Sequence, residues 1–279
     1  MSSIVSSGYL DIVITTYDYT AYFTDNDKVS GTGTNLILGY SLYDDDYIVY
    51  DNSLVGYWDM ETLTSDYKLK DLSKYGNNGT CYNNTTSVNC GNSSEGPKIV
   101  DSNGTSGKAM SFDGLDDRIR INHDPNISFP GEITIYTKFY LDKICTTHVD
   151  GDPCLDTLVM KGGAFNPGFW LFANGYKKYY IEINGNNGGY LVISNQENKI
   201  GINTLVFTKK QDNNKYYING LLDKEQTSNY LLLNNTDNLT IGTAMDTTNR
   251  VFDGLIDEVR IYNRVLTDNE IKMLYDLNK

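Results

Sequence analysis

The feature that most constrains this chain is a series of strand-length apolar runs between residues 131 and 242, separated by turns rich in Asn and Gly. No stretch of helical periodicity intervenes, and the 23 Tyr and 25 Gly of the 279 residues also favour strands over helices. Short strands joined by tight turns predict an all-β, two-sheet antiparallel sandwich. The expected strands are Ile133–Leu141, Leu155–Lys161, Gly168–Ala173, Tyr179–Asn184, Tyr190–Ile193, Thr204–Lys209, Tyr216–Asn219 and Leu239–Gly242.

A further strand is expected near the C-terminus, within residues 251–262. Leu255, Val259 and Ile261 share one parity, so this face is predicted to lie in the core. Asp257 has the same parity. A carboxylate that points into a core must be hydrogen-bonded, paired with a cation or bound to a metal. Asp257 is therefore a candidate functional or structural residue.

The last residues predict a short C-terminal helix. Thr267 suits the N-cap position, and Glu270 follows three residues later, which is the spacing of a capping box. Leu266 and Ile271 have the spacing of a hydrophobic staple across the helix start.

Residues 1–53 differ from the rest of the chain, because they are rich in Tyr and polar linkers. Alternation at Leu10, Ile12 and Ile14 predicts a strand, and further strand-like segments include residues 36–42 and 47–50. Two or three strands rarely form a stable unit alone. This extension is expected to join the main sheet, form a small subdomain, or act as an assembly arm that pairs with another subunit.

The charge balance excludes some partners. With 36 acidic and 23 basic residues the net charge is −13, which argues against nucleic acid and anionic membranes as partners. It suits either divalent cations or an acidic soluble surface. No apolar run is long enough for a membrane helix, so no membrane insertion is expected. No signal peptide is visible, which predicts either a trimmed chain or export inside an assembly such as a virion.

The four cysteines form two local pairs, Cys81 with Cys90 and Cys145 with Cys154, each bracketing a polar loop. Their short spacings favour two disulfides and an oxidising environment. A metal site is the alternative, but no C-x-x-C occurs, and His148 is the single imidazole near the second pair. Asn-X-Ser/Thr sequences, which indicate either glycosylation or simply polar loops, begin at Asn78, Asn83, Asn84, Asn92, Asn103, Asn126, Asn234 and Asn238.

Several motifs, taken in order, resemble the laminin-G-like, concanavalin A-like jelly-roll family over residues 54–275. The resemblance implies a jelly-roll domain over 54–279, with residues 1–53 outside it. The motifs are Leu54–Met60 (L-V-G-Y-W-D-M), Asp71–Thr80 (D-L-S-K-Y-G-N-N-G-T), Gly107–Ile121 (G-K-A-M-S-F-D-G-L-D-D-R-I-R-I), Ile133–Phe139, Leu158–Gly163, Tyr216–Gly220, Leu239–Gly242 and Phe252–Ile271.

Members of this fold often hold a structural calcium where the first strand, a nearby loop and the final strand meet. The resemblance implies calcium ligands at Asp257, with Asp59 and Asn78 as neighbours. Carboxylate, amide and backbone oxygens are the ligands that calcium prefers. The alternative is that Asp257 hydrogen-bonds backbone amides.

Catalytic residues are not expected. The related glucanases carry the pattern E-x-D-x-x-E on one strand, and no such run occurs here. Glu132 and Glu182 are single acids that are expected to face solvent, and His123 and His148 both lie in loops, so a Ser-His-Asp triad has little support.

Sugar binding would use exposed aromatic rings to stack on sugar faces. Tyr176, Tyr190 and Tyr230 are candidates, whereas Trp170 is expected in the core. The loop at residues 150–152 is a second candidate contact surface.

The sequence thus predicts a non-catalytic, lectin-like binding or adhesion module on an extracellular, cell or virion surface, with calcium and a glycan or surface polysaccharide as ligands. One alternative is a structural subunit of a virion decoration, fibre or filament that docks onto its own kind or other subunits through residues 1–53. A glycoside hydrolase is the remaining alternative.

Overall fold

The computed structural model describes residues 3–6, 9–12, 21–22, 28–29, 52–91, 96–102, 107–129, 131–144, 155–162, 168–185, 188–228, 230, 234–244 and 250–277. The chain divides into two compact units, Met1–Asn52 and Ser53–Lys279. This division lies one residue from the boundary that the sequence suggests.

The described residues of the first unit form two short hairpins. Strand β1 (Ser3–Ser6) pairs with β2 (Tyr9–Ile12), and β3 (Ala21–Tyr22) pairs with β4 (Lys28–Val29), both antiparallel. The segments expected at residues 36–42 and 47–50 lie outside the described residues.

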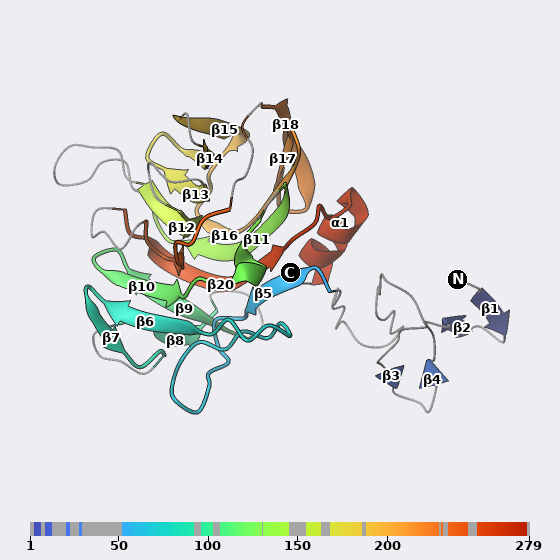
Figure 1. Ribbon diagram of the computed structural model, residues 1–279, viewed down its shortest axis with the longest axis horizontal. Coiled ribbons are helices and arrows are strands. Elements are labelled where there is room, and N and C mark those ends of the chain that lie inside the picture. The colour runs from blue at the N-terminus through green and yellow to red at the C-terminus, as the bar shows by residue number, and fades with distance from the viewer. Residues whose placement is uncertain are drawn as a thin grey trace. The chain divides into compact units, whose positions relative to one another are not determined.

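The second unit is a sandwich of two antiparallel sheets followed by one helix, as the strand spacing and the turns between strands predict (Figure 1). Its elements are β5 (Leu54–Trp58), β6 (Gly79–Asn83), β7 (Thr86–Val88), β8 (Lys98–Asp101), β9 (Lys108–Asp113), β10 (Asp117–Ile121), the 3-10 helix η1 (Pro125–Ile127), β11 (Glu132–Leu141), β12 (Leu155–Lys161), β13 (Gly168–Asn174), β14 (Lys178–Gly185), β15 (Gly188–Glu197), β16 (Gly201–Lys210), β17 (Asn213–Ile218), β18 (Leu221–Thr227), β19 (Leu239–Ile241), β20 (Asp253–Tyr262) and α1 (Asp268–Leu277).

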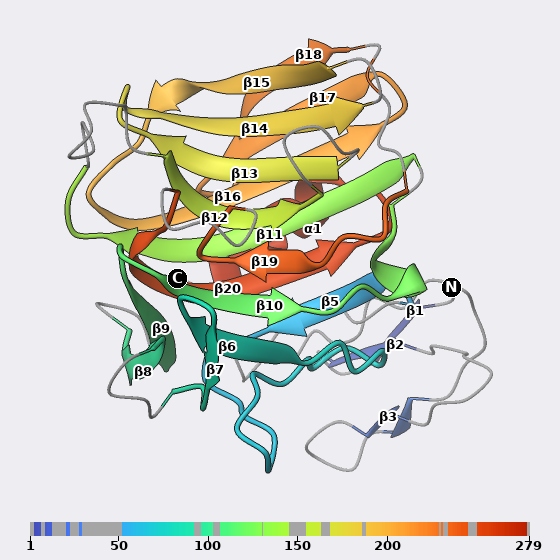
Figure 2. The ribbon, with the colours of Figure 1, turned by 60° about the vertical axis from the view of Figure 1, so that its left-hand side comes forward.

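The two sheets lie face to face. One sheet, here called the β10 sheet, has the order β15-β14-β13-β12-β19-β10-β6-β7, and Figure 2 shows its strands in front. The other, here called the β20 sheet, has the order β18-β17-β16-β11-β20-β9-β8, with β5 also paired to β20. Both are antiparallel throughout, so residues of alternate parity face either the core or the outside.

The core between the sheets is apolar and follows this alternation. On β13, for example, Phe169, Leu171 and Ala173 are core residues, while Trp170 and Phe172 belong to a separate cluster on the outer face. Edge-to-face or tilted ring pairs, including Phe139 with Phe252, fill the space between the sheets.

The two sheets meet along one side at the edge strands β15 and β18. The Asp223 carboxylate on β18 accepts hydrogen bonds from the backbone amides of Asn195 and Gln196 on β15, at 2.6 and 2.9 Å. These bonds satisfy amides that an edge strand otherwise leaves open. Strand β18 was not predicted from the sequence.

Strand β20 contains a β-bulge, so its side chains do not face the sides of the sheet that the sequence predicts. Lys138 pairs with Glu258 and Phe139 with Ile256, so Asp257 is the extra residue. The bulge reverses the alternation, and Ile256, rather than Leu255, joins Val259 in the core. The prediction that Asp257 points into the core was therefore wrong. Its carboxylate instead lies 3.0 Å from the Lys138 ammonium.

The C-terminal helix begins as the sequence predicts. Glu270 accepts hydrogen bonds from the backbone amide and the hydroxyl of Thr267, and the Thr267 hydroxyl accepts one from the Glu270 amide, completing the capping box. Leu266 and Ile271 are both buried. At ten residues α1 is short, and among the described residues no helix is long and apolar enough to span a membrane.

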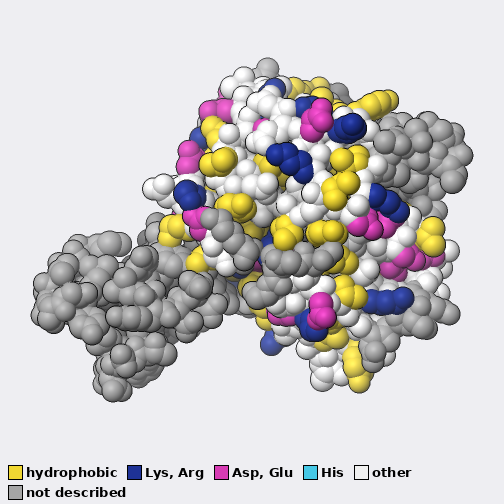
Figure 3. Space-filling view, turned by 180° about the vertical axis from the view of Figure 1, so that it is seen from behind, with side chains coloured by type: hydrophobic (Ala, Val, Ile, Leu, Met, Phe, Trp, Pro, Cys, Tyr) yellow, Lys and Arg dark blue, Asp and Glu magenta, His cyan; other side chains and the backbone are white. Residues whose placement is uncertain are grey.

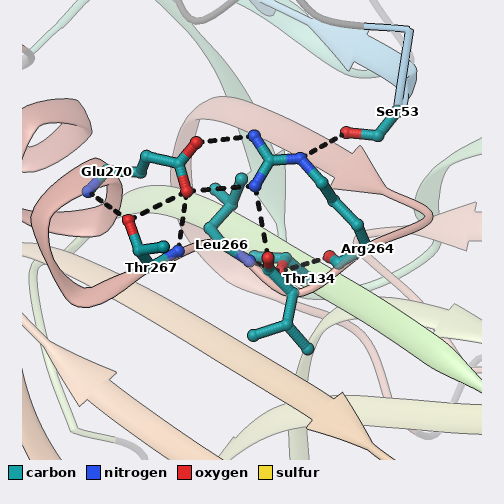
Figure 4. Close-up of polar contacts among 7 residues, drawn as sticks. Ser53, Thr134, Arg264, Leu266, Thr267 and Glu270 are labelled. Atoms are coloured by element: carbon teal, nitrogen blue, oxygen red, sulfur yellow. Dashed lines mark hydrogen bonds and ion pairs between the residues drawn. The ribbon is translucent and has the colours of Figure 1, made fainter. Parts of the chain in front are cut away.

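Arg264 connects this helix to both ends of the domain, as Figure 4 shows. Its guanidinium donates to both Glu270 carboxylate oxygens, at 3.0 and 2.6 Å, and to the Ser53 hydroxyl at 3.0 Å. The Thr134 hydroxyl donates to the Arg264 carbonyl and accepts from the Leu266 amide. The helix, the start of β11 and the first residue of the domain are thereby held together.

The first cysteine pair forms the expected disulfide. Cys81 on β6 and Cys90 are joined, with their Cα atoms 5.2 Å apart, and both are fully buried. Cys145 and Cys154 lie outside the described residues.

Asp156 is a buried acid between the sheets. It lies opposite Ala173, a core residue, and is only 7% exposed. Burial, and then the nearby negative charge of Asp253, raise the Asp156 pKa to about 7, although Lys143 opposes this.

We expect Glu270→Ala to lower the free energy of unfolding by about 2 kcal/mol, because it removes one helix cap and a bidentate, half-buried ion pair. Urea denaturation measures this difference, with Glu197→Ala, which removes an exposed carboxylate, as the control. Equal losses in the two variants would contradict the role of Glu270.

Stability should also depend on pH through Asp156. Its pKa is raised in the folded state, so between about pH 4 and pH 7 the folded chain binds more protons than the unfolded chain, and the stability from this group falls as pH rises. Asp156→Asn imitates the protonated acid. We expect this variant to match the wild type near about pH 3, where the acid is protonated in both the folded and the unfolded chain, and to exceed its free energy of unfolding by roughly 2–4 kcal/mol near about pH 8. Urea denaturation at both pH values checks this, with exposed Asp212→Asn as the control; no gain at the higher pH would refute it.

Candidate functional site

The outer face of the β10 sheet carries a continuous row of side chains across seven strands. The strand register places these residues side by side, and their parity is opposite to that of the core residues. In sheet order from β6 to β15 the row is Thr80, Arg120, Thr240, Met160, Trp170, Glu182 and Leu191.

Three aromatic rings stack along this face. The Trp170 and Phe172 ring centroids are 4.2 Å apart, and those of Phe172 and Tyr180 are 5.2 Å apart, both in stacked geometry. Ala244, from the β19–β20 connection, packs on the same cluster. The three rings are buried, so this stack is a preorganised base rather than an open platform. Trp170 was expected in the core; it is buried, but on the opposite side of the sheet.

Polar groups surround the stack. The Trp170 ring nitrogen donates to the Thr157 hydroxyl at 2.9 Å, which fixes the ring in its plane. The Arg250 guanidinium lies 4.7 Å from the centre of the Trp170 ring, a cation–π contact. Glu182 is half-buried on the same row, and burial raises its pKa while the Arg250 charge opposes the shift.

A second cationic group lies at the other end of the row. Arg118 and Arg120 on β10 both contact the Tyr82 ring, with guanidinium carbons 5.3 and 4.4 Å from its centre. Arg120 also donates a hydrogen bond to the Tyr82 hydroxyl. Sequence reasoning missed these arginines, although the alternating pattern of D-R-I-R-I places both on the face opposite Ile119.

The predicted sugar-stacking tyrosines separate into two places. Tyr176 is 70% exposed at the β13–β14 turn, near Tyr180 and hence beside the aromatic stack. Tyr190 and Tyr230 stack on each other with centroids 5.6 Å apart, at the other end of β14. Both rings pack partly against the core. Tyr176 is therefore the most accessible of the three. The loop at residues 150–152 lies outside the described residues.

The predicted calcium ligands are all engaged with protein groups. Asp59 accepts backbone hydrogen bonds from Glu61 and Thr62, and the Asn78 side-chain oxygen accepts one from the Asp71 amide at 2.9 Å. Asp257 pairs with Lys138. The pairing of Val259 with Trp58 brings Asp59 and Asp257 to the same end of the β5–β20 pair. In this arrangement an ion would have to replace Lys138, so calcium binding stays a prediction.

Another acidic group lies in the β9–β10 turn. Asp113, Asp116 and Asp117 place oxygens within 4.8 Å of one another, the single such group in the part of the chain that the structure describes. Their oxygens accept hydrogen bonds within the turn. The Asp113 carboxylate accepts from the backbone amides of Leu115 and Asp116, and the Asp117 carboxylate accepts from the backbone amide of Asp113. Burial, followed by the charge of Asp113, raises the Asp117 pKa to about 7. These bonds explain the cluster as a tight turn.

Charged side chains of both signs are scattered among apolar ones over the described part of the surface in Figure 3. On the outer face of the β10 sheet between β6 and β14, Glu182 is the sole carboxylate in the described strands. Glu132 is distant from it and pairs with Lys210 on the other sheet at 2.8 Å. The described residues of this face therefore lack the two facing carboxylates of a glycosidase.

Solved structures similar to this one include a domain of an extracellular arabinanase and the binding domains of two toxins. Domain 4 of AbnA, a GH43 extracellular arabinanase from Geobacillus stearothermophilus in complex with arabinotriose, superposes with a TM-score of 0.59 at 21% identity, covering 81% of this chain and 98% of that domain. The binding domain of Paraclostridial Mosquitocidal Protein 1 gives 0.58 at 18% identity, covering 80% of this chain and 52% of that one. The ligand-binding domain of Botulinum neurotoxin serotype D, in complex with N-acetylneuraminic acid, gives 0.57 at 14% identity, covering 80% and 50%.

The chain thus spans about half the length of the toxin binding domains and nearly all of the arabinanase domain. At these identities the likeness establishes the fold alone. No curated protein matched the sequence. A family model described as the concanavalin A-like lectin/glucanases superfamily matches residues 112–272, which is more than half of the chain. The chain therefore belongs to the concanavalin A-like lectin/glucanase superfamily.

Proposed function

We propose that this protein is a non-catalytic carbohydrate-binding module that holds a glycan over the outer face of the β10 sheet. Family membership and the similarity to domain 4 of an arabinanase solved with arabinotriose support a sugar ligand. Fold alone does not assign a ligand, so the proposal depends on the arrangement of residues on this face.

The observation that carries the proposal is the buried stack of Trp170, Phe172 and Tyr180, with accessible polar groups at its margin. Glu182 and Arg250 are half-buried beside it and can exchange hydrogen bonds with sugar hydroxyls. Tyr176 is exposed at the end of the stack and offers a ring face to a sugar. A rigid base with a few polar groups is the usual architecture of a small-ligand site.

The carboxylates on the same face support binding rather than hydrolysis. Glu182 can accept or donate one proton, but glycoside hydrolysis by the common mechanisms needs a second carboxylate across the sugar. The described strands of this face offer no second one. Glu182 is accordingly assigned to hydrogen bonding.

An exterior location accompanies this proposal. The buried Cys81–Cys90 disulfide suits an oxidising compartment. The similar domain from the arabinanase belongs to an extracellular enzyme. Display on a cell or virion surface, and adhesion through the bound glycan, extend the same proposal.

Assembly through residues 1–53 is the second candidate. The observation that favours it is that the described strands of the first unit form two separate two-stranded sheets. Hairpins of this size gain stability by packing against a partner. A subunit that assembles in this way could also bind glycans.

We expect Tyr176→Ala to weaken binding of the best oligosaccharide from a glycan array by about tenfold, because one stacking face is lost. Isothermal titration calorimetry on the full chain measures the change. Tyr67→Ala, which removes another exposed tyrosine from the 64–68 turn, should bind like the wild type. Failure of the wild type to bind any arrayed glycan would refute the proposed function.

Structural calcium at Asp257 remains part of the proposal, because Asp59 lies at the same end of the β5–β20 pair and oxygen ligands are nearby. If an ion replaces Lys138 as the partner of Asp257, chelation with EGTA lowers the melting temperature, and added calcium restores it. Asp257→Asn should remove this sensitivity. An unchanged melting temperature would leave Asp257 with the Lys138 ion pair alone.

A further inference from the structure

The charge on the candidate binding face differs from that of the chain as a whole. The protein has a net charge of −13. The outer face of the β10 sheet between β6 and β14 instead carries Arg118, Arg120 and Arg250 against the one described carboxylate, Glu182. Three of the arginines of an acidic protein thus gather on the face proposed to bind a ligand.

Arg120 is prepared to bind an anion. Its side chain is half-buried, and the cation–π contact and the hydrogen bond to the Tyr82 hydroxyl hold the guanidinium against the Tyr82 side chain. The Arg120 Nε is buried and has no hydrogen-bond partner in the described residues, and no ion pair there involves this side chain. A fixed, half-buried guanidinium that no described carboxylate neutralises favours a carboxylate ligand.

Arg250 provides the second cationic contact. It lies over the Trp170 ring, and within the described residues no ion pair joins it to Glu182. A guanidinium that rests on an aromatic face keeps its edge donors available to a ligand. The Arg250 side chain therefore offers a positive edge directly above the aromatic stack.

The strand register fixes the spacing of the two arginines. Arg120 lies opposite Thr240, Thr240 opposite Met160, and Met160 opposite Trp170, which is the ring beneath Arg250. Three strand spacings amount to roughly 14 Å. This separation exceeds one sugar ring, so the two guanidiniums can contact different units of one oligosaccharide that crosses above the buried Thr240, Met160 and Trp170 side chains.

We propose that the glycan bound on this face is anionic and carries carboxylates, as a chain of uronic acids does. This inference rests on the proposed function and names the ligand class of the same site. Each guanidinium binds one sugar carboxylate, and Glu182 accepts hydrogen bonds from neighbouring hydroxyls. A densely sulfated chain fits less well, because Glu182 lies beside Arg250 and the rest of the protein is strongly acidic.

Affinity measurements on the full chain with three probes test the proposal: polygalacturonate, heparin, and a neutral arabinan of similar length. We expect polygalacturonate to bind at least about tenfold more tightly than the other two at low salt, and to lose this advantage as salt rises. Arg120→Gln and Arg250→Gln should each weaken polygalacturonate binding by about tenfold, and should weaken arabinan binding by no more than about threefold, because arabinan has no carboxylate to lose. Lys199→Gln removes one positive charge from the exposed β15–β16 connection and should have no effect.

Arg120→Lys separates geometry from charge, because it keeps the charge but loses the planar fork; we expect it to restore only part of the affinity lost in Arg120→Gln. Melting temperatures confirm that the variants are folded. Arabinan binding as tight as polygalacturonate, or arginine variants that bind like the wild type, would overturn the anionic assignment while leaving the proposed function intact. Tighter binding of heparin would overturn the carboxylate assignment. Binding of none of the probes or arrayed glycans would remove both proposals.

Discussion

The pairing of strand β20 is the interaction on which the sandwich domain depends. One edge of β20 pairs with β11 along most of its length, and the other edge pairs with β9 and then with β5, the first strand of the domain. Arg264 then ties the chain just after β20 to Ser53 and to the cap of α1. The beginning and the end of the domain are therefore held by the same strand and the same guanidinium. The link between the two ends that the sequence suggests, calcium at Asp257, stays a proposal.

The two sheets use their outer faces differently. On the β20 sheet, charged side chains are paired and buried: Glu258 with Arg260, and Asp257 with Lys138. Each of these charges thus has an opposite charge beside it within the protein, and Arg260 also lies on the Tyr57 ring. On the β10 sheet, Arg120, Glu182 and Arg250 remain half-exposed and form no ion pair in the described residues. This difference is the reason for assigning the ligand to the β10 sheet.

The sequence predicts much of this fold because local signals agree with the final packing. The core strands β12, β13 and β14 form where apolar runs predict strands, and the Thr267–Glu270 capping box forms as its spacing predicts. Strand β18 was missed because its residues, L-L-D-K-E-Q-T, are mostly exposed at a sheet edge and carry no apolar alternation. The orientation of Asp257 was wrong because a bulge depends on pairing with β11, which no local pattern reveals.

The candidate site was harder to predict for a related reason. Alternation can place Trp170 on one face of a strand, but it does not tell which face is the core when both are apolar. The two faces of β13 can be told apart only from the rest of the sheet, which places Arg120, Glu182 and the β19–β20 connection on one side. The site is assembled from strands far apart in the sequence, so its cationic character emerges from sheet order rather than from any motif.

A crystal structure of the full chain with an oligogalacturonide tests the central claim most directly. The account predicts a ligand across β10, β19, β12 and β13, with one carboxylate at the Arg120 guanidinium and another at Arg250. A ligand found at the Tyr190–Tyr230 pair, or on the outer face of the β20 sheet, would contradict it.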